Sequence, residues 1–370
     1  MRVIKGLILN KYFWLLAFML HLGVLLSLYL KFGINLTNES EKYLSIAGRL
    51  NIENCNSELH YLWGYSFYIF FLKTCLMLGL SLNVILVIQY LLSMLGFYLF
   101  YRFIVSRALL PEVYARLTFL VIVTCPLIIY WQLTFYTEIF FLALVLISTY
   151  FFFKKGTNYI SLFLLMVMLI FSRPVGVFYG IALLYILMKE KNFRFSKLFL
   201  YGAYGMMFAI ILFFLPINYS DFALPIYQGS VICGFPVYPD SILKESDYKL
   251  AEIHMFFIAD HGLWNFVVLS AKKAFTFFTV TRPYYSTSHN LVNSAYYPFI
   301  LGGLLGIRQL FRERTHLLFG TYFGWILTAS VSIVILIYNE WSERFIVPLL
   351  PFFILGAFIF VRSFRTKTTI

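Results

Sequence analysis

Long apolar runs, separated by short polar and basic segments, recur along almost the whole chain of 370 residues. Runs long enough to cross a bilayer, which takes about 20 residues, are found from residue 12 to residue 361. The pattern predicts ten spans, at about residues 12–30, 83–103, 116–134, 138–153, 158–172, 175–188, 198–217, 296–311, 317–337 and 345–361. We therefore expect an all-α polytopic membrane protein, with residues 1–370 forming a single integral membrane domain.

The composition agrees with a membrane protein. Hydrophobic residues make up 61% of the chain and charged residues 12%, and the mean hydropathy is +0.83. A soluble domain carries about twice that share of charge. The net charge of +13 is divided among short basic clusters between the spans, as membrane topology requires. We therefore expect membrane lipid as a partner and no nucleic acid.

One apolar and aromatic stretch, 64–81, contains Lys73 and decides the topology. If this stretch crossed the membrane, every later loop would change sides. Placed on the outer face as an interfacial or re-entrant segment, it leaves 18 of the 29 basic residues inside and 13 of the 16 acidic residues outside, in accord with the positive-inside rule. Both termini are then cytoplasmic, and the two long outer loops are 31–82 and 218–295.

Three glutamates lie where spans are expected to emerge on the outer face. Glu39 and Glu41 follow the first span and precede an amphipathic helix start at Tyr43, and Glu138 lies at the start of a later span. A carboxylate held at such a low-dielectric boundary can act as a general base. The alternatives are ordinary solvated loop acids for the first two and an anchoring role for Glu138.

Arginines occur on the same predicted face, namely Arg173, Arg282 and Arg344. The positive-inside rule disfavours arginine on the outer face, so the position of each of these arginines needs an explanation. A guanidinium group matches the oxygens of a phosphate bidentately. Pairing with Glu340 or Glu343, or with lipid headgroups, is the alternative.

Other kinds of chemistry are poorly supported by the chain. The outer-loop histidines lack the compact spacing of a zinc site, and glycine-rich phosphate motifs are absent from the sequence. The expected cytoplasmic loops are too short for a nucleotide-binding domain. Cys55 and Cys233 both fall in outer loops, where an oxidising compartment would permit a disulfide.

Four motifs, taken in order, are similar to those of one enzyme family. They are Glu39-Ser-Glu-Lys-Tyr-Leu-Ser-Ile-Ala47, then Trp63-Gly-Tyr65 through Gln89 and Tyr90, then Thr137-Glu138, and lastly Ser172-Arg-Pro174 with Glu343-Arg-Phe345. The set resembles the GT-C superfamily of membrane glycosyltransferases, in particular the bacterial branch related to protein mannosyltransferases and aminoarabinose transferases. Ser66 stands where that family usually has proline.

The resemblance implies an inverting glycosyltransferase. Such an enzyme moves a sugar from a polyprenyl-phosphate or polyprenyl-pyrophosphate carrier to a glycan, lipid or protein acceptor at the outer leaflet. The chain would then lie in a bacterial inner membrane, with its active site on the periplasmic or extracellular side. A transporter or flippase of lipid-linked glycans, which predicts mid-span charges and repeats, is one alternative. A polymerase or ligase, with its main catalytic loop late in the chain, is another.

The resemblance also implies roles for particular residues. The catalytic carboxylate would be Glu39, or Glu41 if the register differs by two, and Glu138 would position the acceptor or a divalent cation. The carrier phosphate would be bound by arginine, whose charge stabilises the leaving group. These phosphate-binding residues would be Arg173, Arg344 and Arg282, and the donor or acceptor pocket would include Tyr43, Tyr65 and His60.

Overall fold

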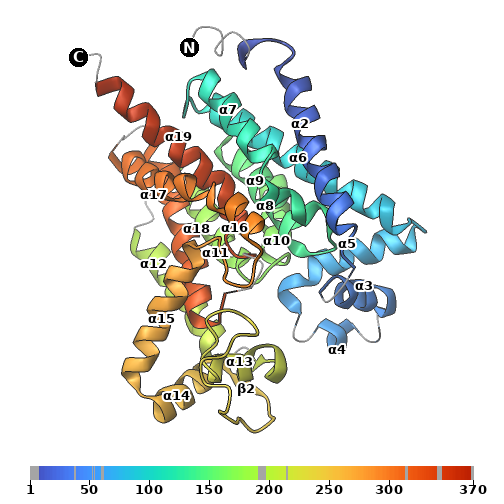
Figure 1. Cartoon of the computed structure of the whole chain (residues 1–370), viewed down its shortest axis with the longest axis vertical. Helices are drawn as coiled ribbons and strands as arrows, with labels where there is room; N and C mark the ends of the chain where they lie inside the picture. Colours follow the sequence, from blue (N-terminus) through green and yellow to red (C-terminus); the bar gives the residue numbers. More distant parts are fainter. Residues whose placement is uncertain are drawn as a thin grey trace. The chain divides into compact units, whose positions relative to one another are not determined.

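The computed structural model describes residues 8–36, 39–51, 53, 55–59, 62–190, 197–213, 216–312, 316–339 and 344–367. The protein is 77% helical, which confirms the all-α class. Two strands of two residues, β1 (Pro216–Ile217) and β2 (Tyr248–Lys249), pair antiparallel (Figure 1).

The chain forms two compact units. The first unit comprises Met1–Leu187, Pro298–Phe323 and Val347–Ile370, and the second comprises Met188–Tyr297 and Gly324–Ile346. Helix α18 (Leu317–Leu336) contributes residues to both units. The predicted catalytic glutamates and Arg173 belong to the first unit, whereas Arg282 and Arg344 belong to the second.

Among the described residues, three helices are long and apolar enough to cross a bilayer, which indicates a membrane protein. They are α2 (Phe13–Phe32), α6 (Leu82–Ser106) and α18. The expected span 116–134 is broken, because α7 (Glu112–Val123) is followed by a bend of 49° before residues 126–133. Pro126 begins the short helix α8 (Pro126–Ile129) after the break, and proline has no N–H to continue the helical hydrogen bonds. The residues after α8 form the turn η2 (Tyr130–Leu133).

The other predicted spans coincide with helices that do not meet both the length and the hydropathy of a span. These helices are α9 (Thr137–Phe153), α10 (Tyr159–Ile170), α11 (Gly176–Glu190), α12 (Lys197–Phe213), α17 (Tyr297–Arg312) and α19 (Leu350–Lys367), the last preceded by η5 (Val347–Leu349). The expected number of ten spans is therefore not confirmed. The sides of the membrane and the orientation of the termini also stay predictions.

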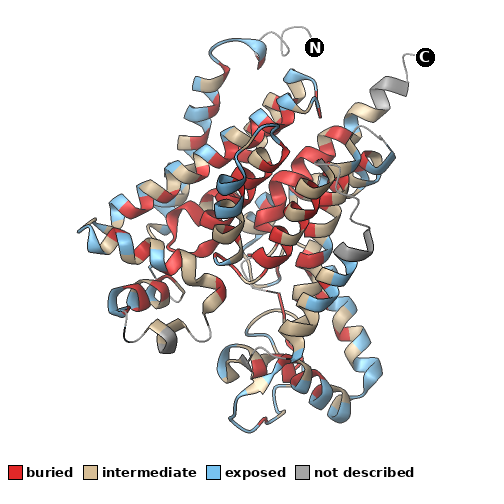
Figure 2. Ribbon diagram, turned by 180° about the vertical axis from the view of Figure 1, so that it is seen from behind, coloured by how far each residue is buried: buried red, intermediate tan, exposed pale blue. Residues whose placement is uncertain are grey.

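Helix α9 is the buried centre of the first unit. Every side chain from Thr137 to Thr149 is buried, as expected of a helix that is hydrophobic on all sides. The helix packs on α6 and α10, and Gly96 of α6 lies so close that an added Cβ would be 3.1 Å from the Cα of Ala143. The N-terminal helix α2, by contrast, leaves most of its surface exposed (Figure 2).

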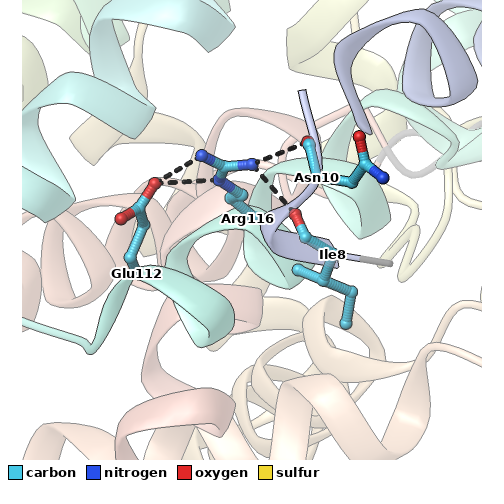
Figure 3. Close-up of polar contacts among 4 residues, drawn as sticks. All are labelled: Ile8, Asn10, Glu112 and Arg116. Atoms are coloured by element: carbon cyan, nitrogen blue, oxygen red, sulfur yellow. Dashed lines mark hydrogen bonds and ion pairs between the residues drawn. The ribbon is translucent and has the colours of Figure 1, made fainter. Parts of the chain in front are cut away.

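Arg116 of α7 holds the segment just before α2 in place (Figure 3). Its Nη1 donates to the carbonyl oxygens of Ile8 and Asn10, at 2.9 and 3.2 Å. Its Nε and Nη2 donate to Oε1 of Glu112, one turn earlier on the same helix. The entry into α2 is thereby fixed to α7, which α2 also contacts.

The expected first outer loop contains four helical pieces. They are α3 (Glu39–Arg49), α4 (Cys55–Leu59), the 3₁₀ turn η1 (Trp63–Tyr65) and α5 (Ser66–Met77). The amphipathic start predicted at Tyr43 belongs to α3. Helix α5 has 12 residues, a length of about 18 Å, which is too short to cross a bilayer. The interfacial or re-entrant placement of 64–81 stays a prediction.

The expected large outer loop, 218–295, is mainly helical and lies in the second unit. Its elements are the π-helical turn η3 (Tyr219–Ala223), α13 (Leu224–Tyr227), α14 (Leu250–His261), α15 (Leu263–Phe278) and α16 (Thr287–Ser294). A core that includes Ile226, Ile253 and Tyr338 packs this region against the residues that follow α18. Cys55 lies in the first unit and Cys233 in the second, and both are thiols in the structure.

Candidate functional site

Glu138 and Arg173 form a buried ion pair in the first unit. Oε1 of Glu138 lies 3.1 Å from Nη1 of Arg173, and the two side chains are 0% and 3% exposed. Glu138 lies in the first turn of α9, where the helix dipole favours a negative charge. Arg173 follows α10, and its guanidinium carbon lies 6.0 Å from the centre of the Phe141 ring. The pair therefore joins two of the motifs that the sequence singled out.

The start of α3 is attached to the segment that leads into α9. Oγ of Ser40 accepts a hydrogen bond from the backbone N–H of Phe135 at 3.1 Å and donates to the carbonyl oxygen of Asn35 at 3.0 Å. The backbone N–H of Asn35 donates in turn to the carbonyl oxygen of Leu133 at 3.0 Å. These bonds bring the N-terminus of α3 to the N-terminus of α9.

The two candidate bases of α3 lie on different faces of the helix. Glu39 shares a face with Tyr43 and Ile46, at the i, i+4 and i+7 positions, and both of those residues are buried. Glu39 itself is half-buried, whereas Glu41 and its i+4 neighbour Ser45 are exposed. The fold thus separates two residues that the sequence left equivalent, and Glu39 is the one on the inward face.

The turn η1 packs against the loop that carries Arg173. Gly64 lies so close to Pro174 that an added Cβ would be 2.8 Å from the proline Cγ. The backbone N–H of Phe67 donates to the carbonyl oxygen of Phe171 at 2.9 Å. A third predicted motif therefore packs on the loop that carries Arg173, and glycine is needed at the point of closest approach.

The predicted pocket tyrosines take different positions. Tyr43 is 1% exposed, and its ring lies 5.7 Å from those of both Tyr65 and Tyr68. Tyr65 is half-buried, so it keeps accessible surface, whereas Tyr43 contributes packing. His60 lies outside the described residues.

A chain of two buried hydrogen bonds links α5, α6 and the segment before α9. The Tyr68 hydroxyl donates to Oε1 of Gln89 at 2.7 Å, and Nε2 of Gln89 donates to the carbonyl oxygen of Thr134 at 3.2 Å. Burial raises the pKa of the Tyr68 phenol well above its usual range, and the negative charge of Glu138 raises it further. No role was predicted for Tyr68, although it lies in the aromatic stretch 64–81, three residues after Tyr65.

Arg282 and Arg344 are buried within the second unit. Nη1 of Arg282 donates to the carbonyl oxygen of Thr279 at 2.7 Å, to its Oγ1 at 2.8 Å and to the carbonyl oxygen of Thr281 at 3.0 Å. This part of the guanidinium therefore holds its own loop together. Arg344 is 6% exposed, and its proposed partners Glu340 and Glu343 lie outside the described residues.

A second cluster of basic groups, which the sequence analysis did not single out, lies in the second unit. Nζ of Lys273 donates to the carbonyl oxygen of Ile337, just after α18, and Lys273 is 2% exposed. Burial lowers the pKa of Lys273 to about 7. Burial, and then the charge of Lys273, lowers the pKa of His254 to about 4. The available sequence signal was that Lys273 shares an i, i+4 stripe of α15 with the buried Leu269 and Phe277.

The described residues do not offer a cage for a metal ion. Among them, no group of three or more His, Cys, Asp or Glu side chains is placed to hold one. The carboxylate of Glu138 is engaged with Arg173 instead. The described residues thus do not fit the divalent cation that the family resemblance allowed.

Compared with protein-family models, curated proteins and solved structures, the chain matches none. The resemblance to GT-C enzymes therefore rests on the four sequence motifs.

Proposed function

We propose that the protein is a membrane glycosyltransferase of the GT-C type. It transfers a sugar from a polyprenyl-phosphate carrier to a glycan, lipid or protein acceptor at the outer face of the membrane. The observation that supports this proposal is that two motif-bearing segments are joined, by hydrogen bonds and close packing, to the start of α9 and to the loop of Arg173, the two places that hold the buried pair. These segments are the start of α3 and the turn η1 with α5.

A structural role for the Glu138–Arg173 pair is the simpler alternative. Removing two charges from water is expensive, and an apolar pair of similar volume is often as stable or more stable. Ionisable groups within membrane proteins are usually retained for function. The pair therefore calls for a role besides stability, and binding an anion is the role that fits an arginine.

Arg173 is the proposed ligand of the carrier phosphate. Its guanidinium has five N–H donors in a planar fork, and Nη1 is the atom nearest to Glu138. Glu138 keeps the charge of Arg173 compensated before the donor binds and holds the guanidinium in one orientation. A donor group that is fixed in advance stabilises charge on a leaving phosphate without further reorganisation.

Glu39 is the proposed general base. In the reaction the acceptor hydroxyl attacks the anomeric carbon of the sugar and gives its proton to the Glu39 carboxylate. The bond from the anomeric carbon to the phosphate oxygen breaks, and the polyprenyl phosphate leaves with the electron pair, stabilised by Arg173. Attack on the side opposite to the phosphate inverts the configuration at that carbon.

Single substitutions test these roles by measuring sugar transfer from a labelled polyprenyl-phosphate donor in membranes. Glu39→Gln, Glu138→Gln and Arg173→Gln should each abolish turnover, because they remove the base, the orienting carboxylate and the phosphate ligand. Glu41→Gln is the matched comparison, since it makes the same chemical change two residues away on the exposed face, and it should keep wild-type turnover. Normal turnover in Glu39→Gln and Arg173→Gln at wild-type expression would end the proposal.

A further inference from the structure

The segment Gly64–Tyr68, here called the clasp, contacts the surroundings of both members of the ion pair. On the arginine side, Gly64 lies against Pro174 with no room for a Cβ, and the Phe67 N–H bonds to the carbonyl oxygen of Phe171. The backbone on both sides of Arg173 is therefore in contact with the clasp.

On the glutamate side, the clasp acts through two hydrogen bonds in series. Tyr68 donates to Gln89, and Gln89 donates to the carbonyl oxygen of Thr134, in the segment that begins α9. Tyr68 and Gln89 are both 0% exposed, so water does not compete for these bonds. The raised pKa of the phenol keeps it protonated and donating. That donation fixes which end of the Gln89 amide faces Tyr68, and hence which end faces Thr134.

The clasp is also held rigidly between these two contacts. The ring of Tyr68 packs at 5.3 Å from that of Phe140 in α9 and at 5.7 Å from that of Tyr43 in α3. The ring of Phe67 lies 5.9 Å from that of Phe140. We therefore expect a displacement at either end to be transmitted to the other.

We propose that the clasp, with Gln89, is the positioning element of the site, setting how Glu138 and Arg173 lie relative to each other. This inference rests on the proposed function, because positioning matters only if the pair acts on a substrate. Misplacing reacting groups by about 1 Å can lower a rate by about 100-fold. Tyr68 and Gln89 are thus positioning residues, which act through Thr134 and need not touch the substrate.

The first test removes the hydroxyl of Tyr68 and leaves its ring. Tyr68→Phe and Gln89→Leu should each lower kcat for sugar transfer roughly tenfold, the equivalent of one lost hydrogen bond, and the double variant should be no slower than the slower single one. Tyr322→Phe is the matched control, because its buried hydroxyl is 3.2 Å from Oγ1 of Thr149, farther along α9. It should shift the thermal midpoint as Tyr68→Phe does and leave kcat unchanged.

The second test perturbs the arginine side. Gly64→Ala places a Cβ against Pro174 and should lower kcat at least tenfold, since the neighbouring backbone must move. Gly23→Ala is its control, because a Cβ at Gly23 meets nothing within 4 Å. If Gly64→Ala and Tyr68→Phe both turn over like their controls, the inference is wrong while the proposed function stands.

A spectroscopic readout keeps the inference testable should the wild type transfer no sugar. The infrared carboxylate band of Glu138, isolated as the difference between wild type and Glu138→Gln, should shift in Tyr68→Phe and Gly64→Ala and not in the two controls. A shift without transfer activity supports the clasp and counts against the glycosyltransferase. An unchanged band in both clasp variants overturns the clasp.

Discussion

Replacing the Glu138–Arg173 pair by apolar residues separates its contribution to stability from its contribution to function. At the observed separation of 3.1 Å, two unit charges attract by about 5 kcal/mol at an effective dielectric constant of about 20. Glu138→Leu or Arg173→Met alone leaves one buried charge uncompensated and should lower the free energy of unfolding by about 3–5 kcal/mol. The double variant removes both charges and should unfold with nearly the wild-type free energy.

The assay is a double-mutant cycle in detergent micelles, with unfolding followed by the loss of helical circular dichroism on titration with a denaturing detergent. With those losses, the coupling energy between the two positions should be about 6–10 kcal/mol. We also expect all three variants to be inactive in sugar transfer, including the stable double variant. Additive losses would refute the buried ion pair. Transfer by the double variant would refute the functional reading.

Three further predictions concern stability and topology. Burial lowers the pKa of Lys273 from 10.5 to about 7 and that of His254 from 6.5 to about 4, so the unfolded chain binds protons more readily than the folded one. The free energy of unfolding should therefore fall as the pH is lowered from 10.5 to 7, because of Lys273, and again from 6.5 to 4, because of His254. Lys273→Met should remove the first of these two falls. Helices α17 and α19 pack so closely that a Cβ at Gly306 would clash with the carbonyl oxygen of Gly356. Gly306→Val should therefore lower the thermal midpoint by several degrees, whereas Gly202→Val, at an open position, should not. A reporter fused after residue 82 should signal from outside the cell, and a cytoplasmic signal would contradict the predicted topology.

Much of the helix content could be predicted from the apolar runs. A segment packed in apolar surroundings favours a helix, whether or not it crosses the membrane. Pro126 could be seen in the sequence, but the apolar run continues on both sides of it, so the break in the helix was not predicted. The number of spans is harder to predict. An apolar run of 12 to 17 residues has the same sequence pattern in a buried helix such as α9 as in a short membrane crossing. Ten spans therefore could not be established from hydropathy alone.

The candidate site was predictable where residues are adjacent in the sequence and unpredictable where contacts are distant. The acidic start of α3 could be read directly, but the preference for Glu39 over Glu41 depends on which face of α3 is buried. The bond from Tyr68 to Gln89 joins residues 21 positions apart, and no local pattern marks it. The carbonyl oxygens that hold Arg282 in its own loop are backbone groups, which are present at every position and so leave no signal in the sequence.

The most direct measurement of the central claim uses purified protein in proteoliposomes with a synthetic polyprenyl-phosphate sugar and the products resolved by thin-layer chromatography. The wild type should release one polyprenyl phosphate for each sugar transferred, and Arg173→Gln should release none. Movement of the donor between leaflets with its sugar still attached, and no free polyprenyl phosphate, would contradict the account in favour of a flippase.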